Sequence, residues 1–179
     1  MTRPIDRVLS RLAQYDGAPI RLMEVCGTQT AEISRHGIRH LLPPGIQMIS
    51  GPGCPVCVTV TAYVDRLVWL SRQENTTVVS FGDLFRVPGS RESLSEAKAS
   101  GGHAVMVYAP SQMLTMARQQ PDHQFVFAAV GFETTAPIYA GMIRRAKEEG
   151  LQNLKFLTSL KTMPAALRWI CDHEPDIHG

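Results

Sequence analysis

Two cysteines three positions apart lie in the segment GPGCPVC, Gly51 to Cys57, of this 179-residue chain. Glycine permits backbone angles that are closed to other residues, and the two prolines of the segment stiffen the loop. The spacing of Cys54 and Cys57 lets both sulfurs face one point, which suits a metal ion or a reversible disulfide. We expect a helix to begin near Val58, so that its N-terminus favours the thiolate form of this pair.

Other interpretations of the pair stay open at this point. Free cysteines are often buried and then act as small hydrophobic residues. A C-x-x-C sequence is also half of a structural zinc site, although no second C-x-x-C or H-x-x-x-H follows at a suitable distance. A thioredoxin-like site would use two thiols, whereas a third thiol, Cys26, lies on the preceding loop and needs its own explanation.

Cys26 follows the apolar segment 20–25 and either packs at the end of a strand or meets the Cys54/Cys57 pair. If the strands that precede the two loops are neighbours in a parallel sheet, their carboxyl ends lie about 5 Å apart, or about twice that with one strand between them. Three thiols at one edge of a sheet would suit a soft metal such as low-valent iron.

A further loop, GFETTAP, follows the apolar segment that ends at Val130. Thr134 or Thr135 can cap the next helix, and Pro137 suits its first turn. Glu133 then has two possible roles. It complements the helix dipole, or it carries protons in the same cleft as the sulfurs.

The elements that must position these loops follow from the alternation of apolar or β-branched segments with segments of helical spacing. This alternation predicts βαβ units, and therefore an α/β fold with a mostly parallel sheet, Rossmann-like βα repeats and helices on both faces. Ligands gather at the carboxyl ends of such strands, where the three loops would meet. The expected strands are 20–25, 46–50, 77–81, 104–108, 125–130 and 154–159, and the expected helices are 30–36, 58–72, 93–100, 111–119, 137–149 and 164–172.

The polar, proline-containing segment 118–124 indicates a domain boundary. We expect residues 1–121 to form a first α/β lobe with the thiol motifs. Residues 122–179 would then begin a second, incomplete lobe.

Composition argues against several classes of protein. Hydrophobic residues make up 44% and charged residues 19% of the chain, with a net charge of +2, which is typical of a globular protein. The sequence contains no dense run of Lys and Arg of the kind that would indicate a nucleic-acid partner. The charged N-terminal segment 1–17 resembles neither a signal peptide nor a membrane span, so we expect a cytoplasmic protein whose four cysteines serve metal or redox chemistry.

Four motifs in this order, MEVCGTQT, GPGCPVC, FGDLFRVPGS and GFETTAP, resemble the HypD family of hydrogenase maturation factors. The resemblance implies a scaffold on which the Fe(CN)2CO centre of nickel-iron hydrogenase is assembled, rather than an enzyme that turns over a substrate. It also implies a complex with HypC and cyanide supplied by HypE. The residue roles that it implies are iron binding by Cys26, a redox-active pair of Cys54 and Cys57, and a cleft lined by Glu133 and Thr134.

Gly27, Gln29 and Gly53 are the remaining residues that the resemblance assigns to binding. Family members usually have histidine at the position of Gln29, so a role for that imidazole is lost, although Gln29 can still donate a hydrogen bond. A full family member is roughly twice as long and has a C-terminal iron-sulfur region with a four-iron cluster, which we expect to be absent here. We therefore expect a fragment, a split subunit or a remnant, in which self-association or a partner that supplies the missing half covers apolar surface. A thiol-disulfide oxidoreductase and an inactive remnant are the alternative functions.

Overall fold

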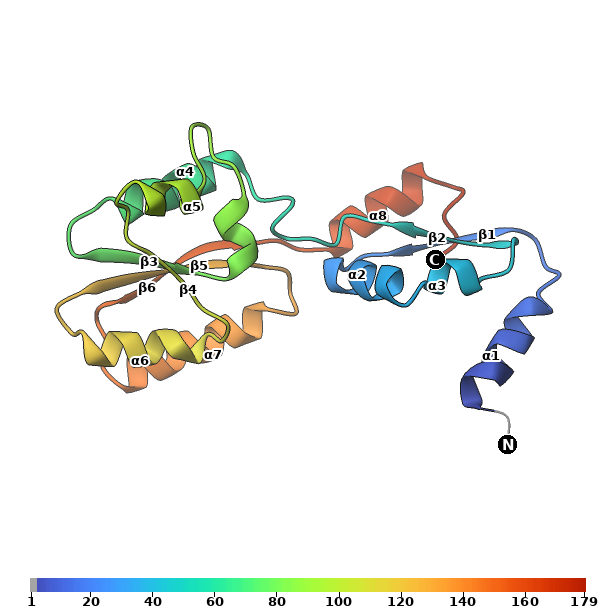
Figure 1. The fold of residues 1–179 in the computed structure, drawn as a ribbon, viewed down its shortest axis with the longest axis horizontal. Helices are drawn as coiled ribbons and strands as arrows, with labels where there is room; N and C mark the ends of the chain where they lie inside the picture. Colours follow the sequence, from blue (N-terminus) through green and yellow to red (C-terminus); the bar gives the residue numbers. More distant parts are fainter. Residues whose placement is uncertain (1–2) are drawn as a thin grey trace. The chain divides into compact units, whose positions relative to one another are not determined.

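The protein, whose computed structural model describes residues 3–179, folds into two compact units. Unit 1 extends to Cys54 and resumes with Pro164–Gly179, and unit 2 consists of Pro55–Met163. Each unit has its own sheet, and all pairs of named strands are parallel (Figure 1). The expected α/β class with helix-flanked parallel strands is therefore confirmed, but the strands are divided between two sheets.

Unit 1 is built on two strands, β1 (Ile20–Glu24) and β2 (Ile46–Ser50). Helices α2 (Gly27–Arg35) and α3 (Ile38–Leu41) connect them and lie on one face, with α8 (Pro164–His173) on the other (Figure 1). Gly37, at φ 60°, takes the left-handed conformation at which α2 gives way to α3. Helix α1 (Pro4–Ala13) precedes β1 and was not expected from the sequence.

The last residues of the chain lie beside β1. The backbone N–H of His178 donates to the carbonyl of Arg21 at 2.8 Å, and the N–H of Met23 donates to the carbonyl of Gly179 at 2.6 Å. Successive residues of a strand direct their backbone groups to alternate sides, so these bonds use the edge of β1 that β2 leaves open. The end of the chain is thus hydrogen-bonded to the outer edge of β1 in unit 1.

Unit 2 contains a four-stranded sheet in the order β4-β3-β5-β6. Two helices cover each face (Figure 1). Central β5 is buried along seven of its eight residues, as parallel strands between two helical layers usually are. The strands are β3 (Thr76–Ser80), β4 (Ala104–Met106), β5 (Gln124–Gly131) and β6 (Leu154–Leu160); helices α4 (Thr61–Ser71) and α5 (Leu94–Ala99) cover one face, and α6 (Ser111–Gln119) and α7 (Ala136–Glu148) cover the other.

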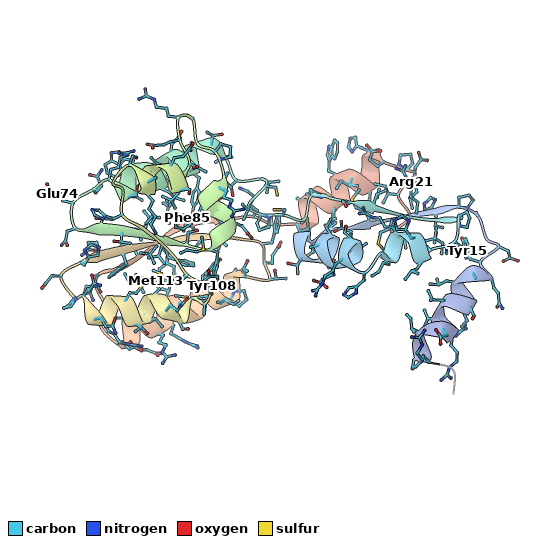
Figure 2. The ribbon with its side chains drawn as sticks, viewed as in Figure 1. Tyr15, Arg21, Glu74, Phe85, Tyr108 and Met113 are labelled. Atoms are coloured by element: carbon cyan, nitrogen blue, oxygen red, sulfur yellow. The ribbon has the colours of Figure 1, made fainter. Side chains whose placement is uncertain are left out.

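The hydrophobic core lies in unit 2, in clusters on the two faces of the sheet. Phe85, on the short 3-10 helix Gly82–Arg86, belongs to one cluster and Met113 of α6 to another (Figure 2). Within residues 3–179, every buried hydrophobic side chain belongs to unit 2. Within the same range of unit 1, only Glu24 and Gly53 are buried, so its one buried side chain is a carboxylate.

The six expected strands are all present, and their observed limits differ from the expected ones by two residues or fewer. The boundary expected between residues 121 and 122 falls inside unit 2, because β5 pairs with β3 across it, with Gln124 opposite Thr76. Over residues 3–179, no helix is both long and apolar enough to cross a membrane.

Candidate functional site

The loops that carry Cys26 and Cys54 follow neighbouring strands of unit 1. Glu24 ends β1 directly opposite Ser50, which ends β2. The N–H of Gly51 then donates to the carbonyl of Glu24 at 2.8 Å. Both loops therefore leave the sheet at the same edge, as the sequence argument for neighbouring strands required.

Gly53 brings the two loops into backbone contact. A Cβ atom at this buried position would lie 1.8 Å from the carbonyl carbon of Val25 and 2.2 Å from the nitrogen of Cys26. A Cβ atom on Gly27 would lie 3.7 Å from the Cβ of Cys54, which is ordinary van der Waals contact. The loops are thus packed so closely that position 53 has no room for a side chain, whereas position 27 has.

Cys54 and Cys57 are disulfide-bonded, with Cys54 half-buried and Cys57 exposed. The expectation that Cys57 adjoins a helix N-terminus is wrong, because α4 begins only at Thr61. Before it, the chain forms a turn in which the hydroxyl of Thr59 donates to the carbonyl of Pro55 at 2.9 Å. These local bonds keep the segment after Cys57 out of the helix, so the helix dipole does not act on this pair as expected.

Cys26 is the cysteine that adjoins a helix. It is the residue immediately before α2, its thiol is free, and its side chain is half-buried. Its carbonyl accepts hydrogen bonds from the N–H of Thr30 at 2.9 Å and from the Thr30 hydroxyl at 3.2 Å. The sequence placed the helix start at Thr30, three residues too late, because Gly27 and the threonines are weak helix formers. Gln29 lies in the first turn of α2 and is exposed.

Glu24 is a site residue that the sequence reasoning missed. Its carboxylate accepts the Thr30 hydroxyl at 2.6 Å and the Cys26 N–H at 3.3 Å, and lies 4.0 Å from the Arg39 guanidinium. Burial acts to raise the pKa of the Glu24 carboxyl, but hydrogen bonds from Thr30, Ser50 and the Cys26 amide, with the charge of Arg39, outweigh it and hold the pKa below its ordinary value. The available signal was an acidic residue in the otherwise apolar segment before Cys26.

Glu133 and Thr134 lie in unit 2, on the loop between β5 and α7, and both are exposed. Glu133 accepts a hydrogen bond from the N–H of Met163 at 2.9 Å. Thr135 precedes α7, but its hydroxyl donates to the carbonyl of Phe132 and makes no capping bond. The expectation that this loop shares one sheet edge with the thiol loops assumed a single sheet, whereas β5 belongs to a different sheet from β1 and β2.

The chemistry that these cysteines offer is that of a free thiol, Cys26, and a disulfide. A deprotonated cysteine sulfur is a ligand for soft metals, and a disulfide exchanges with other thiols. Among residues 3–179, no group of three or more His, Cys, Asp or Glu side chains is arranged to hold a metal ion.

Comparison with known proteins identifies relatives over nearly the whole chain. The model of a family described as "HypD: Hydrogenase formation hypA family" matches residues 3–179. The chain is 42% identical over 168 residues to hydrogenase maturation factor HypD of Rhodobacter capsulatus, covering 92% of this chain and 45% of that protein. It is 38% identical over 167 residues to the factor of the same name from Escherichia coli (strain K12), covering 93% and 44%. A third such factor, from Rhizobium leguminosarum bv. viciae, is 38% identical over 178 residues, covering 99% and 46%. The chain thus spans somewhat less than half the length of these relatives.

Proposed function

This chain belongs to the HypD family of hydrogenase maturation proteins, and on that premise we propose that it is part of the scaffold on which the Fe(CN)2CO centre of nickel-iron hydrogenase is assembled. The observation that carries the proposal is the backbone contact between the loop of Cys26 and the loop of Cys54. It supports the proposal because the loop of a free thiol packs against the loop of a disulfide-bonded cysteine, and an assembly scaffold for a soft metal would use both groups.

In this proposal iron is the cargo, and the sulfur of Cys26 binds it. The position of Cys26 supports this role, since its free thiol is half-buried at the end of β1. HypC is the proposed partner that shares the iron, and HypE the proposed source of cyanide. Gly27 and Gln29, which follow Cys26 on α2, would shape the approach to the iron.

The proposed role of Cys54 and Cys57 is to store and release an electron pair. Reduction of their disulfide takes up two electrons and two protons and gives two thiols, and reoxidation releases them. The exposure of Cys57 supports access by an external dithiol or electron carrier. In this proposal the electrons come from such a donor. Glu133 and Thr134 are proposed as polar groups in the same process, with their exposure in support.

We further propose that unit 1 is covered in the functional assembly. Its hydrophobic residues within the described range all remain at least partly exposed. The cover would come either from a polypeptide that corresponds to the remaining half of the relatives, or from a second copy of the chain. Sedimentation of the chain, alone and mixed with HypC, distinguishes self-association from binding of a partner.

The test of the assembly role is anaerobic copurification with HypC, followed by infrared spectroscopy for bound cyanide and carbon monoxide. We expect both sets of bands in the unaltered chain and their loss in Cys26→Ser. Cys171→Ser is the matched control, because Cys171 is also a free cysteine but lies exposed on α8, and it should keep the bands. A complex with HypC that shows no such bands would contradict the proposal.

The disulfide favours one alternative, a thiol-disulfide oxidoreductase that uses Cys54 and Cys57 alone. This function needs no iron, so Cys26→Ser would leave disulfide exchange with a dithiol substrate unchanged. Retained exchange in Cys26→Ser, together with the absence of infrared bands in every variant, would favour the alternative. If disulfide exchange, iron and HypC binding were all absent, an inactive remnant would be the conclusion.

A further inference from the structure

Glu24 lies at the junction of the two thiol loops and is 9% exposed. We propose that Glu24 is a positioning residue, which fixes the backbone of Cys26 and the start of the Cys54 loop relative to each other. The inference rests on the proposed function in one respect only, that the position of Cys26 matters for iron binding.

The side chain of Glu24 holds Cys26 from both sides. One carboxylate oxygen accepts the N–H of Cys26 at 3.3 Å. The other accepts the hydroxyl of Thr30 at 2.6 Å, and that hydroxyl also lies 3.2 Å from the carbonyl of Cys26. The peptide groups before and after Cys26 are thus linked to one carboxylate, directly and through Thr30, so the residue has little freedom to rotate.

The main chain and the surroundings of Glu24 hold the second loop. Its carbonyl accepts the N–H of Gly51 at 2.8 Å, where the chain leaves β2. Arg39 lies 4.0 Å from the carboxylate and donates to the Ser50 hydroxyl at 2.7 Å, so it links Glu24 to the end of β2. Hydrogen bonds that involve a charged group are stronger than neutral ones, which suits a role in holding loops rather than in filling space.

Glu24 has the one buried side chain of unit 1 within residues 3–179, and burial of a carboxylate there needs an explanation. A charged group is expensive to remove from water unless it is well paired and hydrogen-bonded. An apolar residue at the end of β1 would bury its side chain at no such cost, but it would leave the Cys26 N–H and the Thr30 hydroxyl without this acceptor. The buried carboxylate therefore serves to hold the loops in position, and it is not needed for the stability of the sheet.

Amide hydrogen exchange, measured residue by residue by NMR, distinguishes positioning from general stabilisation. Glu24→Gln keeps the shape of the side chain but removes the charge and one of the two acceptor oxygens. Because the Cys26 N–H loses a charged acceptor, we expect exchange at Cys26 to accelerate about tenfold, and exchange at Gly51 to rise with it. Exchange of the amides inside β1 and β2 should change less than about twofold, because the two loops can open locally while the paired strands stay closed.

A second variant and a control complete the design. Thr30→Val removes the hydroxyl that bonds to both the Glu24 carboxylate and the Cys26 carbonyl, but it leaves the bonds to the end of β2 in place. It should therefore accelerate exchange at Cys26 and leave Gly51 unchanged. Glu32→Gln is the matched control, because Glu32 is an exposed glutamate on the same helix that pairs with Arg35 instead of with the loops.

Two results would overturn the inference: unchanged exchange at Cys26 and Gly51 in Glu24→Gln, or equal acceleration across the whole sheet. If Glu24→Gln does not fold, unchanged exchange at Cys26 in Thr30→Val overturns it. Neither measurement uses iron or HypC. If Glu24→Gln shows the expected acceleration of exchange but the unaltered chain shows no infrared bands, the proposed function is refuted and the role of Glu24 stands.

Discussion

Replacing Gly53 by alanine perturbs the contact on which the candidate site depends. The new Cβ would lie 1.8 Å from the carbonyl carbon and 1.9 Å from the carbonyl oxygen of Val25. Non-bonded carbon atoms prefer a separation of about 3.5 to 4 Å, so one of the two loops must retreat by about 2 Å. The atoms that obstruct it belong to the backbone, which cannot move aside as a flexible side chain does. We expect a loss of about 1 to 3 kcal/mol in the stability of unit 1, as for other overpacked sites.

The assay is the rate at which iodoacetamide alkylates Cys26 while the Cys54–Cys57 disulfide is intact, in a Cys171→Ser background. Retreat of the loop uncovers Cys26, and a loss of about 1.4 kcal/mol of local packing corresponds to a rate about tenfold higher. Gly27→Ala is the matched control, since its Cβ would meet Cys54 at an ordinary 3.7 Å and should change the rate less than about twofold. Equal rates for the two variants would refute the argument that backbone contact at Gly53 holds the loops together.

Three further predictions concern unit 2. Leu67→Ala removes a side chain with 0% exposure and should lower the free energy of unfolding by about 3 kcal/mol in urea denaturation. Ser93→Ala breaks a capping box in which Ser93 and Glu96 bond reciprocally, and should cost about 1 kcal/mol by the same assay. Hydrogen bonds from the side chain and the backbone of Ser90 hold the pKa of Asp65 below its ordinary value, so this carboxylate stabilises the fold at neutral pH and stops doing so as pH falls through the lowered pKa. Thermal melts of Asp65→Asn should accordingly fall below those of the unaltered chain at neutral pH and converge with them in acid; a constant difference at every pH would contradict this.

The strands were predictable from the sequence because each is a short β-branched or apolar run bounded by turn residues. The strand Ile46–Ser50 and the helix Ser111–Gln119 match their expected limits, since the turn residues Pro44 and Gly45 precede the first and Pro110 precedes the second. Which strands pair was not predictable. The pairing depends on packing between elements distant in the chain, and periodicity carries no information on it. For this reason the division of the strands into one sheet of β1 and β2 and another of β3 to β6 was not predicted.

Helix starts near the thiols were the least predictable part of the site. Val58 suits a helix in an apolar pattern, but the bonds that Thr59 makes to its own turn compete with the helix. The adjacency of the Cys26 and Cys54 loops followed correctly from the assumption of neighbouring strands. The role of Glu24 did not, because a hydrogen-bonded carboxylate and a solvent-exposed one look alike in a sequence.

The discontinuity of unit 1 has a consequence for synthesis on the ribosome. Unit 2 is one continuous segment, and its residues are all available as soon as Met163 has emerged. Helix α8 and the residues that bond to the outer edge of β1 are translated later, so unit 1 cannot close before them. Nascent chains are therefore expected to fold unit 2 before unit 1, whereas domains usually fold in order from the N-terminus. During that interval Cys26 would be exposed to cellular oxidants and chaperones.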